Sequence, residues 1–254
     1  MKWVGLIGVV FCCADVIAQG YSDAAQTAFA GADVVNIRNG FQDINPASIT
    51  QLEKSKIGIS QSSPFIIKDL QWNSIFYTNK FRNNYWALDY KNFSFDRYRN
   101  RHTAFLFGKK LQENLSLGIR IKLVNIRAEE IQRYFLAHSI GINYRPRKHL
   151  VIGSYYVRDP LLNAYLRTGI GYNKYKKVPL FLSFEINEKQ QIKLASALEY
   201  ILSKNLSTRF SLSSSENFMG FGFSYSIKKI QIEASTTLHT YLGPSPCITL
   251  SYEF

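Results

Sequence analysis

The last residues of the chain, 246–254 (PCITLSYEF), decide how the rest of the sequence is interpreted. Successive side chains of an extended strand point to opposite faces, so Ile248, Leu250, Tyr252 and Phe254 share one apolar face, and the residues between them form a polar face. A transmembrane β-barrel needs this pattern, because one face meets lipid, the other meets the lumen, and aromatic residues gather at the interface. The stretch therefore predicts the closing strand of a membrane barrel, with an edge strand of a soluble protein as the alternative.

The same alternation recurs through the whole of residues 54–254, with no composition break that would mark a second domain. The expected strands lie near residues 55–60, 70–78, 84–92, 102–109, 115–125, 134–144, 150–157, 165–173, 179–187, 191–200, 206–213, 218–227, 230–239 and 246–254. An even number of strands separated by short turns is typical of bacterial single-chain barrels. We therefore predict an all-β fold, a transmembrane antiparallel barrel of about 14 strands. Two soluble sandwiches are the alternative.

Charged residues fall on the polar faces of these strands. Placing such a face in lipid costs about 2–4 kcal/mol for each Arg or Lys near the midplane, so we expect the charged faces to line the lumen. The predicted lumen charge network comprises Asp89, Arg120, Lys122, Arg167, Glu185, Lys193, Glu199, Arg209, Glu233 and Glu253. These residues form either an internal salt-bridge network that closes a narrow barrel or an aqueous path lined by both signs, and we expect a plugged lumen.

Residues 1–18 have the pattern of a secretory signal peptide. Lys2 supplies the positive start, residues 4–13 the apolar stretch, and Ala18 a small residue at the expected cleavage site. Acylation of Cys12 or Cys13 in a lipoprotein is the alternative. Cleavage after Ala18 would leave one cysteine in the mature chain, so no intramolecular disulfide is expected.

Residues 19–53 lack strand alternation and precede the first expected strand. Ser22 can cap a short helix, and Gly31 is expected to end it. Asn45-Pro46 favours a turn, because the residue before a proline is driven out of the helical region. We predict that this segment folds into the lumen as an N-terminal plug.

The sequence AGADV at residues 30–34, followed by the motif Asn45-Pro46-Ala47, resembles the amino terminus of FadL-type outer-membrane proteins. It is nearer still to the PorV/PorQ branch, which is associated with the type IX secretion system of Bacteroidetes. Phe29-Ala30 stands where that family often has Leu-Gly. The resemblance implies a 14-stranded barrel whose plug contains Asn45, Pro46 and Ala47, and protein partners in a secretion or surface complex. The apolar face of the terminal strand likewise resembles the insertion signal of outer-membrane proteins.

The net charge of +13 is not evenly distributed along the chain. If the carboxy terminus is periplasmic, the turns on that side form a basic rim: Lys109, Lys110, Arg145, Arg147, Lys148, Lys174, Lys176, Lys177, Lys228 and Lys229. The rim suits anionic phospholipid or an acidic protein partner. An exported chain without a nucleic-acid motif is not expected to bind nucleic acid.

No catalytic or metal-binding pattern stands out. The four histidines lack a metal spacing, and His138 and Ser139 are adjacent, so they point to opposite faces and cannot pair. We predict no enzyme activity, no metal and no cofactor. The glycines of the repeats at residues 169–171 and 220–222 lie within strands, where they would allow a plug or a neighbouring strand to approach closely. The outward loops are short, and the longest are expected at residues 93–102 and 125–134.

Three functions remain open. The first is an accessory or attachment subunit of a protein secretion system in the bacterial outer membrane, of the type IX, PorV/PorQ-like kind. The second is a FadL-like plugged channel for small hydrophobic compounds. The third is a structural barrel that docks a periplasmic partner. A continuous apolar pocket beside residues 45–48 would favour the channel, whereas a filled, salt-bridged lumen with a flat exposed edge for a partner would favour the subunit.

Overall fold

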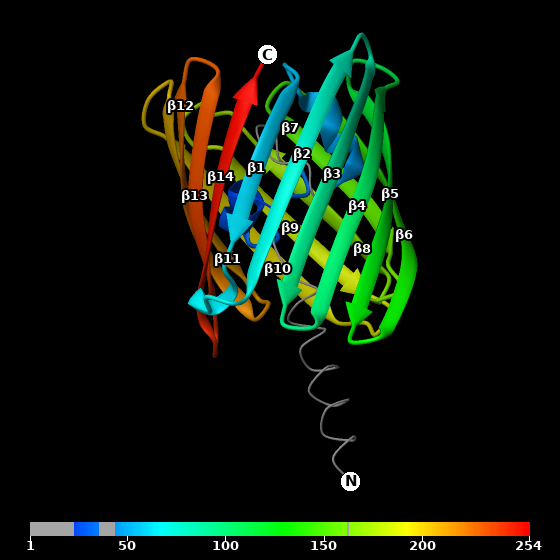
Figure 1. Cartoon of the computed structure of the whole chain (residues 1–254). Helices are drawn as coiled ribbons and strands as arrows, with labels where there is room; N and C mark the ends of the chain where they lie inside the picture. Colours follow the sequence, from blue (N-terminus) through cyan, green and yellow to red (C-terminus); the bar gives the residue numbers. More distant parts are fainter. Residues whose placement is uncertain (1–22, 36–43, 162) are drawn as a thin grey trace.

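The computed structural model describes residues 23–35, 44–161 and 163–254. These residues form a closed barrel of 14 antiparallel strands, in which each strand pairs with its neighbours in sequence and β1 pairs with β14 (Figure 1). The predicted all-β barrel is therefore confirmed. The predicted signal peptide at residues 1–18 lies outside the described residues, as do Ser22 and residues 36–43.

The strands follow the predicted order along the chain. They are β1 (Lys56–Ser62), β2 (Gln71–Phe81), β3 (Asn84–Phe95), β4 (Tyr98–Lys110), β5 (Leu115–Ala128), β6 (Ile131–Arg147), β7 (Leu150–Arg158), β8 (Tyr165–Tyr172), β9 (Leu180–Asn187), β10 (Ile192–Ile201), β11 (Leu206–Ser213), β12 (Asn217–Ile227), β13 (Ile230–His239) and β14 (Gly243–Glu253). Among the described residues, the longest connection runs from residue 63 to residue 70 and contains the 3-10 helix η2 (Pro64–Ile66).

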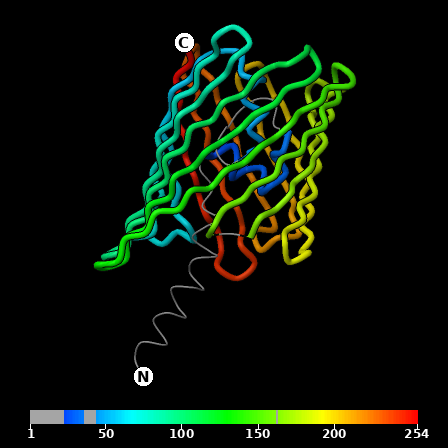
Figure 2. Tube along the Cα trace, turned by 90° about the vertical axis from the view of Figure 1, so that its right-hand side faces the viewer, coloured from blue at the N-terminus to red at the C-terminus, as the bar shows by residue number. Residues whose placement is uncertain are grey.

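The prediction of loops at residues 93–102 and 125–134 was wrong. These segments are paired ends of β3, β4, β5 and β6, and only residues 96–97 and 129–130 form the turns. Polar side chains occupy the lipid-side face here, so the apolar alternation stops although the backbone pairing continues. The tip of the β5–β6 hairpin stands apart from the rest of the barrel in Figure 2.

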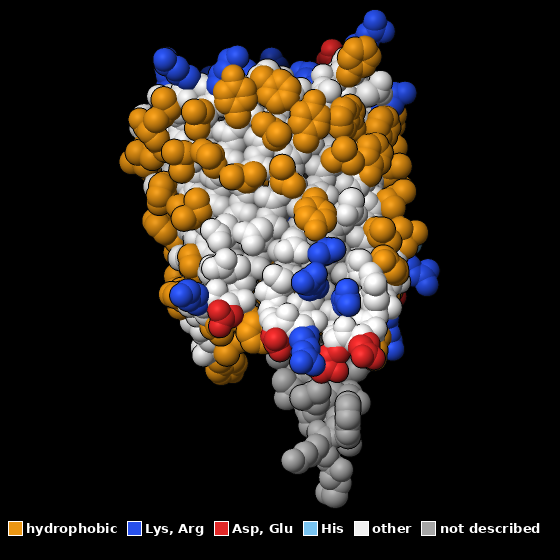
Figure 3. Space-filling model, viewed as in Figure 1, with side chains coloured by type: hydrophobic (Ala, Val, Ile, Leu, Met, Phe, Trp, Pro, Cys, Tyr) orange, Lys and Arg blue, Asp and Glu red, His pale blue; other side chains and the backbone are white. Residues whose placement is uncertain are grey.

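The outer surface of the barrel is apolar. Ile248, Leu250, Tyr252 and Phe254 are exposed on the outside of the barrel, whereas Cys247 is buried. Figure 3 shows a belt of hydrophobic side chains around the visible face, with Lys and Arg along the upper edge, where the carboxy terminus lies in Figure 1. Apolar side chains on this surface meet lipid, and the buried apolar clusters lie on the inside, where the plug packs against the barrel wall.

The amino-terminal segment lies inside the barrel, where Figure 2 shows it in blue. We call residues 23–35 and 44–52 the plug. It contains the helix α2 (Ala24–Phe29), which packs against β11–β14, and the 3-10 helix η1 (Pro46–Gln51), which packs against β3–β6. Among the described residues, no helix is long and apolar enough to cross a membrane.

The helix α2 has well-defined caps. Asp23 accepts a hydrogen bond from the backbone N–H of Gln26 (2.7 Å), one position after the predicted cap. Ala30 ends the helix in the left-handed region with φ 43°, and Gly31 follows with φ 95°. Burial raises the pKa of the Asp23 carboxyl to about 6, against the lowering effect of the hydrogen bond from Gln26.

Candidate functional site

The motif Asn45-Pro46-Ala47 fixes one half of the plug to the barrel wall. The fully buried Asn45 side chain donates from Nδ2 to the carbonyl oxygen of Ile142 (3.0 Å) and to Oδ1 of Asn143 (2.8 Å), both on β6. Its own Oδ1 accepts from the N–H of Ala47 (3.0 Å) and so caps η1. One side chain thus both starts η1 and fastens it to β6.

Glycines on the inner face of the wall make room for this motif. A Cβ at Gly118 on β5 would lie 2.3 Å from the carbonyl carbon of Pro46, and a Cβ at Gly141 on β6 would lie 2.0 Å from Asn45 Oδ1. Gly118 and Gly141 are cross-strand partners, so together they form a strip without side chains on which the plug rests. The glycines at 169, 171, 220 and 222 also lie against the plug, which confirms their interpretation as points of close approach.

A buried ion triad lies under the other half of the plug. Arg209 on β11, 2% exposed, bonds Glu199 on β10 (Nε–Oε1 3.2 Å) and Glu233 on β13 (Nη1–Oε1 2.7 Å). Its guanidinium also lies 5.6 Å from the ring centroid of Phe29 in α2. Two carboxylates around one guanidinium leave a net negative group on the inner side of the wall, where Lys56 of β1 is also buried.

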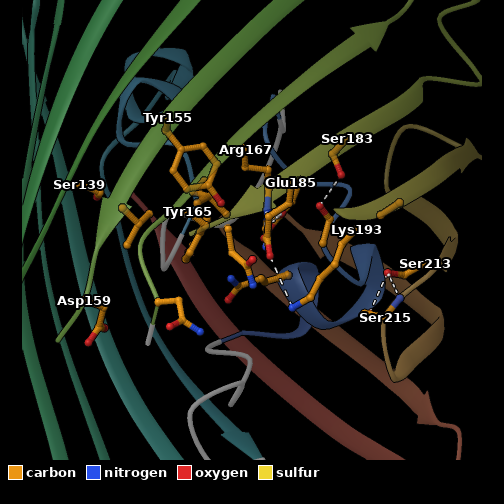
Figure 4. Close-up of a pocket in the computed structure, with 18 of the residues that line it drawn as sticks. Ser139, Tyr155, Asp159, Tyr165, Arg167, Ser183, Glu185, Lys193, Ser213 and Ser215 are labelled. Carbon is orange, nitrogen blue, oxygen red and sulfur yellow. Dashed lines mark hydrogen bonds and ion pairs between the residues drawn. The ribbon is translucent and has the colours of Figure 1, made fainter. Parts of the chain in front are cut away.

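A second charged group connects β8, β9 and β10 to the plug. Arg167 bonds Glu185 (Nε–Oε2 2.8 Å), and its Nη1 lies 3.6 Å from Asp33 of the plug. Lys193 approaches the same Glu185 (3.5 Å). Figure 4 shows Arg167, Glu185 and Lys193 converging, with Tyr155 beside them. The ring of Tyr155 lies 5.8 Å from the guanidinium of Arg167.

The other predicted lumen charges form separate pairs. Arg120 bonds Asp89 (2.8 Å), Lys122 bonds Asp159 (2.7 Å), and Glu253 lies 4.0 Å from Lys56 at one mouth of the barrel. The structure therefore places the predicted residues in several local groups.

Sequence reasoning missed three members of these groups: Asp33, Lys56 and Asp159. Lys56 shares its strand face with Gly58 and Ser60, so alternation alone could have placed it inside. Asp33 and Asp159 lie outside strands, where alternation carries no information.

A polar cavity of about 650 Å³ opens beyond the plug, at the end of the barrel opposite the carboxy terminus. Its lining includes Gly31 and Asp33 of the plug together with Arg167, Lys193 and Asp159, and Figure 4 shows several serines facing it. The cavity lining does not include residues 45–48. Within the described residues, no cluster of His, Cys, Asp or Glu could hold a metal ion.

The predicted basic rim lies at the turns and strand ends of the carboxy-terminal end (Figures 1 and 3). Two of its lysines lie against aromatic rings: Lys229 Nζ is 5.8 Å from the ring centroid of Tyr252, and Lys110 Nζ is 5.6 Å from that of Tyr85. Tyr252 belongs to the outer surface and Tyr85 to the lumen. The rim therefore presents positive charge both to the lipid boundary and across the mouth of the lumen.

No protein-family model matches the sequence, and no curated protein matches it. Among solved structures, the chain is similar to a FadL homologue of Pseudomonas aeruginosa, with a TM-score of 0.61 and 10% identity over 92% of this chain and 98% of that one. It is also similar to the outer membrane protein Omp33 of Acinetobacter baumannii, with a TM-score of 0.59 and 8% identity over 79% of this chain and 98% of that one. At these identities the similarity shows the fold.

The closed sheet, the apolar outer belt and the charged interior define the class of this protein: it is an outer-membrane β-barrel. Within that class it has a FadL-like barrel architecture with a lumen occupied by its own amino-terminal segment.

Proposed function

We propose that this barrel acts as an accessory or attachment subunit of a protein secretion system at the outer membrane, of the PorV/PorQ-like kind. The observation that carries the proposal is the filled lumen. The plug is fastened to opposite walls, through Asn45 to β6 and through α2 to β11–β14. In this proposal the blocked lumen does not conduct solutes, and the barrel acts through the surfaces that it presents to partner proteins. The resemblance of residues 30–34 and 45–47 to PorV/PorQ proteins supports the finer assignment.

The basic rim supplies the partner-facing surface in this proposal. Exposed lysines such as Lys174, Lys176 and Lys177 sit on the β8–β9 connection, beyond the outer belt. Clustered positive charge favours association with an acidic protein surface by electrostatic steering. Contact with anionic phospholipid is the competing role for the same residues.

Purification from membranes in mild detergent tests the proposal. We expect another outer-membrane or periplasmic component of a secretion system to co-purify in a fixed ratio, and we expect no steady conductance in planar bilayers. The variant K174Q/K176Q/K177Q should recover less of that component. The control K68Q/R133Q/R158Q removes the same charge from exposed positions at the opposite end and should recover as much as the wild type. A lone barrel that conducts ions steadily would contradict the proposal.

A FadL-like channel for small hydrophobic compounds is the second candidate. It is favoured by the similarity to the FadL homologue over 92% of the chain. The polar, charged lining of the cavity counts against it. Saturable binding of a fluorescent fatty acid, reduced by a larger side chain at Ser183, would favour the channel over the subunit.

A further inference from the structure

An arginine cluster lies on the outer surface of the barrel just beyond the apolar belt. Along β5 the outward residues Ile119, Ile121 and Leu123 are exposed apolar side chains, with Ile121 49% exposed. The next two outward positions are Asn125 and Arg127. The belt therefore ends at Leu123 on this strand, and polar side chains begin immediately after it.

The neighbouring strand β4 changes in the same way. Its outward side chain at Phe105 is apolar, and the exposed residues Arg101 and Arg99 follow after Thr103. Figure 3 shows Lys and Arg side chains gathered below the hydrophobic belt on this side of the molecule. The two strands together place three arginines on one outer face.

Two of these arginines oppose each other directly. Arg99 on β4 and Arg127 on β5 are cross-strand partners, and Arg101 lies opposite Asn125. Like charges directly opposite one another in a sheet destabilise it. Among the described residues, none of the three arginines lies within 4 Å of a carboxylate oxygen. Arg127 Nε donates to the backbone oxygen of Glu129 (3.5 Å).

Amide side chains surround the cluster. Arg101 Nε donates to Asn92 Oδ1 (3.3 Å), and Gln132 Nε2 donates to Asn125 Oδ1 (3.1 Å) and to the hydroxyl of Tyr134 (2.7 Å). These contacts order the side chains around the arginines without neutralising them. Among the described residues, this outward face has hydrogen-bond donors and positive charge but no carboxylate, because the nearby acidic residues lie in the turns at 96–97 and 129–130.

The height of the cluster matches the lipid head groups. A strand rises about 3.3 Å per residue and tilts by about 40° in such barrels. Position 125 therefore lies about 5 Å beyond Leu123 along the membrane normal, and Arg127 lies about 10 Å beyond it. The head-group layer on each side of the hydrocarbon is about 5–8 Å thick, so Arg101, which lies opposite Asn125, falls within it. Arg99 and Arg127 lie just beyond this layer, and their long side chains can reach back into it.

We propose that Arg99, Arg101 and Arg127 form a binding site for the phosphate groups of an anionic lipid at this end of the barrel. A guanidinium binds phosphate through two parallel hydrogen bonds, and a phosphate between Arg99 and Arg127 turns their repulsion into two attractions. If the carboxy terminus is periplasmic, the lipid belongs to the outer leaflet. This site lies on a surface that the proposed secretion function does not use.

Binding of bisphosphorylated lipid A to the purified full-length protein in detergent tests the site. The variant R99Q/R101Q/R127Q should bind it about a hundredfold more weakly, which corresponds to about 2.8 kcal/mol. The control K68Q/R133Q/R158Q removes the same charge at the same end, and its affinity for lipid A should stay within about threefold of the wild type. General electrostatic attraction would weaken equally in the two variants, whereas a local site is lost only in the arginine variant. Equal losses in the two variants would overturn the site.

Two further probes distinguish binding of a phosphorylated lipid from binding of free phosphate. Lipid A without phosphates should bind as weakly to the wild type as intact lipid A binds to the arginine variant. Inorganic phosphate at the same concentration should not protect the protein against heat. Protection by inorganic phosphate equal to that by lipid A would show a site for free phosphate and would refute the lipid assignment.

The single substitution Arg127→Gln should shift the thermal midpoint in opposite directions in the absence and in the presence of lipid A. Without lipid it removes the repulsion from Arg99, so the thermal midpoint should rise by about 1–3 °C. With lipid A present the midpoint should fall below that of the wild type, because one phosphate ligand is lost. A midpoint that falls in both conditions would mean that the arginine is only structural, and the proposal would be wrong.

Discussion

The substitution Gly118→Ala tests how the plug is seated. The new Cβ would lie 2.3 Å from the carbonyl carbon of Pro46 and 2.4 Å from the backbone nitrogen of Ala47, whereas ordinary contacts begin at 3.4 Å. Both atoms belong to the backbone and cannot rotate away, so the plug must withdraw by about 1 Å. That movement takes the two hydrogen bonds of Asn45 to β6, at 2.8 and 3.0 Å, out of range.

The expected cost follows from these contacts. Two lost hydrogen bonds at about 0.5–1.5 kcal/mol each give about 1–3 kcal/mol against the seated plug. The closed ladder of strands is not touched, so the barrel should keep its resistance to detergent unfolding. We expect the variant to show conductance events in planar bilayers and faster proteolysis within residues 44–52.

The matched control is Gly171→Ala. Its Cβ would meet the Cγ2 methyl of Val35 in the plug at 2.9 Å, which is a smaller overlap, and with a side chain instead of the plug backbone. We therefore expect the control to perturb the plug clearly less than Gly118→Ala does. If Gly118→Ala remained silent in bilayers and as resistant to protease as the control, the plug would not rest on the backbone of β5, and the reasoning would fail.

Three further outcomes follow from the charges and faces of the barrel. Arg209→Met should lower the free energy of unfolding in urea by about 3–5 kcal/mol, because it leaves Glu199 and Glu233 as unpaired buried carboxylates. Adding Glu199→Gln and Glu233→Gln should recover most of that loss, and no recovery would argue against charge as the cause. Ile121→Arg should cost about 2–4 kcal/mol when the protein folds into liposomes, since this exposed side chain faces lipid; an unchanged stability would place β5 outside the membrane. Phe254→Ser removes the ring stacked on Tyr252 (6.3 Å between centroids) and should slow membrane insertion severalfold in a reconstituted assay, whereas an unaltered rate would exclude the last residue from the insertion signal.

The strands could be predicted because lipid imposes their pattern. Wherever a strand crosses the membrane, every second side chain must be apolar, and β12 shows this with Phe221, Phe223 and Tyr225 on its exposed face. The prediction failed at residues 93–102 and 125–134, where the strands leave the apolar belt. Water and head groups accept polar side chains on both faces, so nothing in the residue types marks the continuing strand.

The sequence could place the inner charged residues in the lumen, but it could not predict which of them pair with one another. Arg209 pairs with residues of strands close in the barrel order, and alternation brings these to one side of the wall. Arg167 in addition approaches Asp33 of the plug, and that contact depends on where an irregular segment lies inside the cylinder. The position of Asp33 inside the barrel cannot be predicted from the alternation of the strands, because the plug itself has no periodic pattern.

The position of the plug has a consequence for assembly. The backbone N–H of Ala24 donates to Oγ1 of Thr249 on β14 (2.8 Å), while η1, from the same short segment, rests on β3–β6. The first strand follows directly after this segment and pairs with the last one. The plug and the β1–β14 closure therefore share residues at both ends of the described barrel, so a change at this seam is expected to affect the seating of the plug as well as the closure of the sheet.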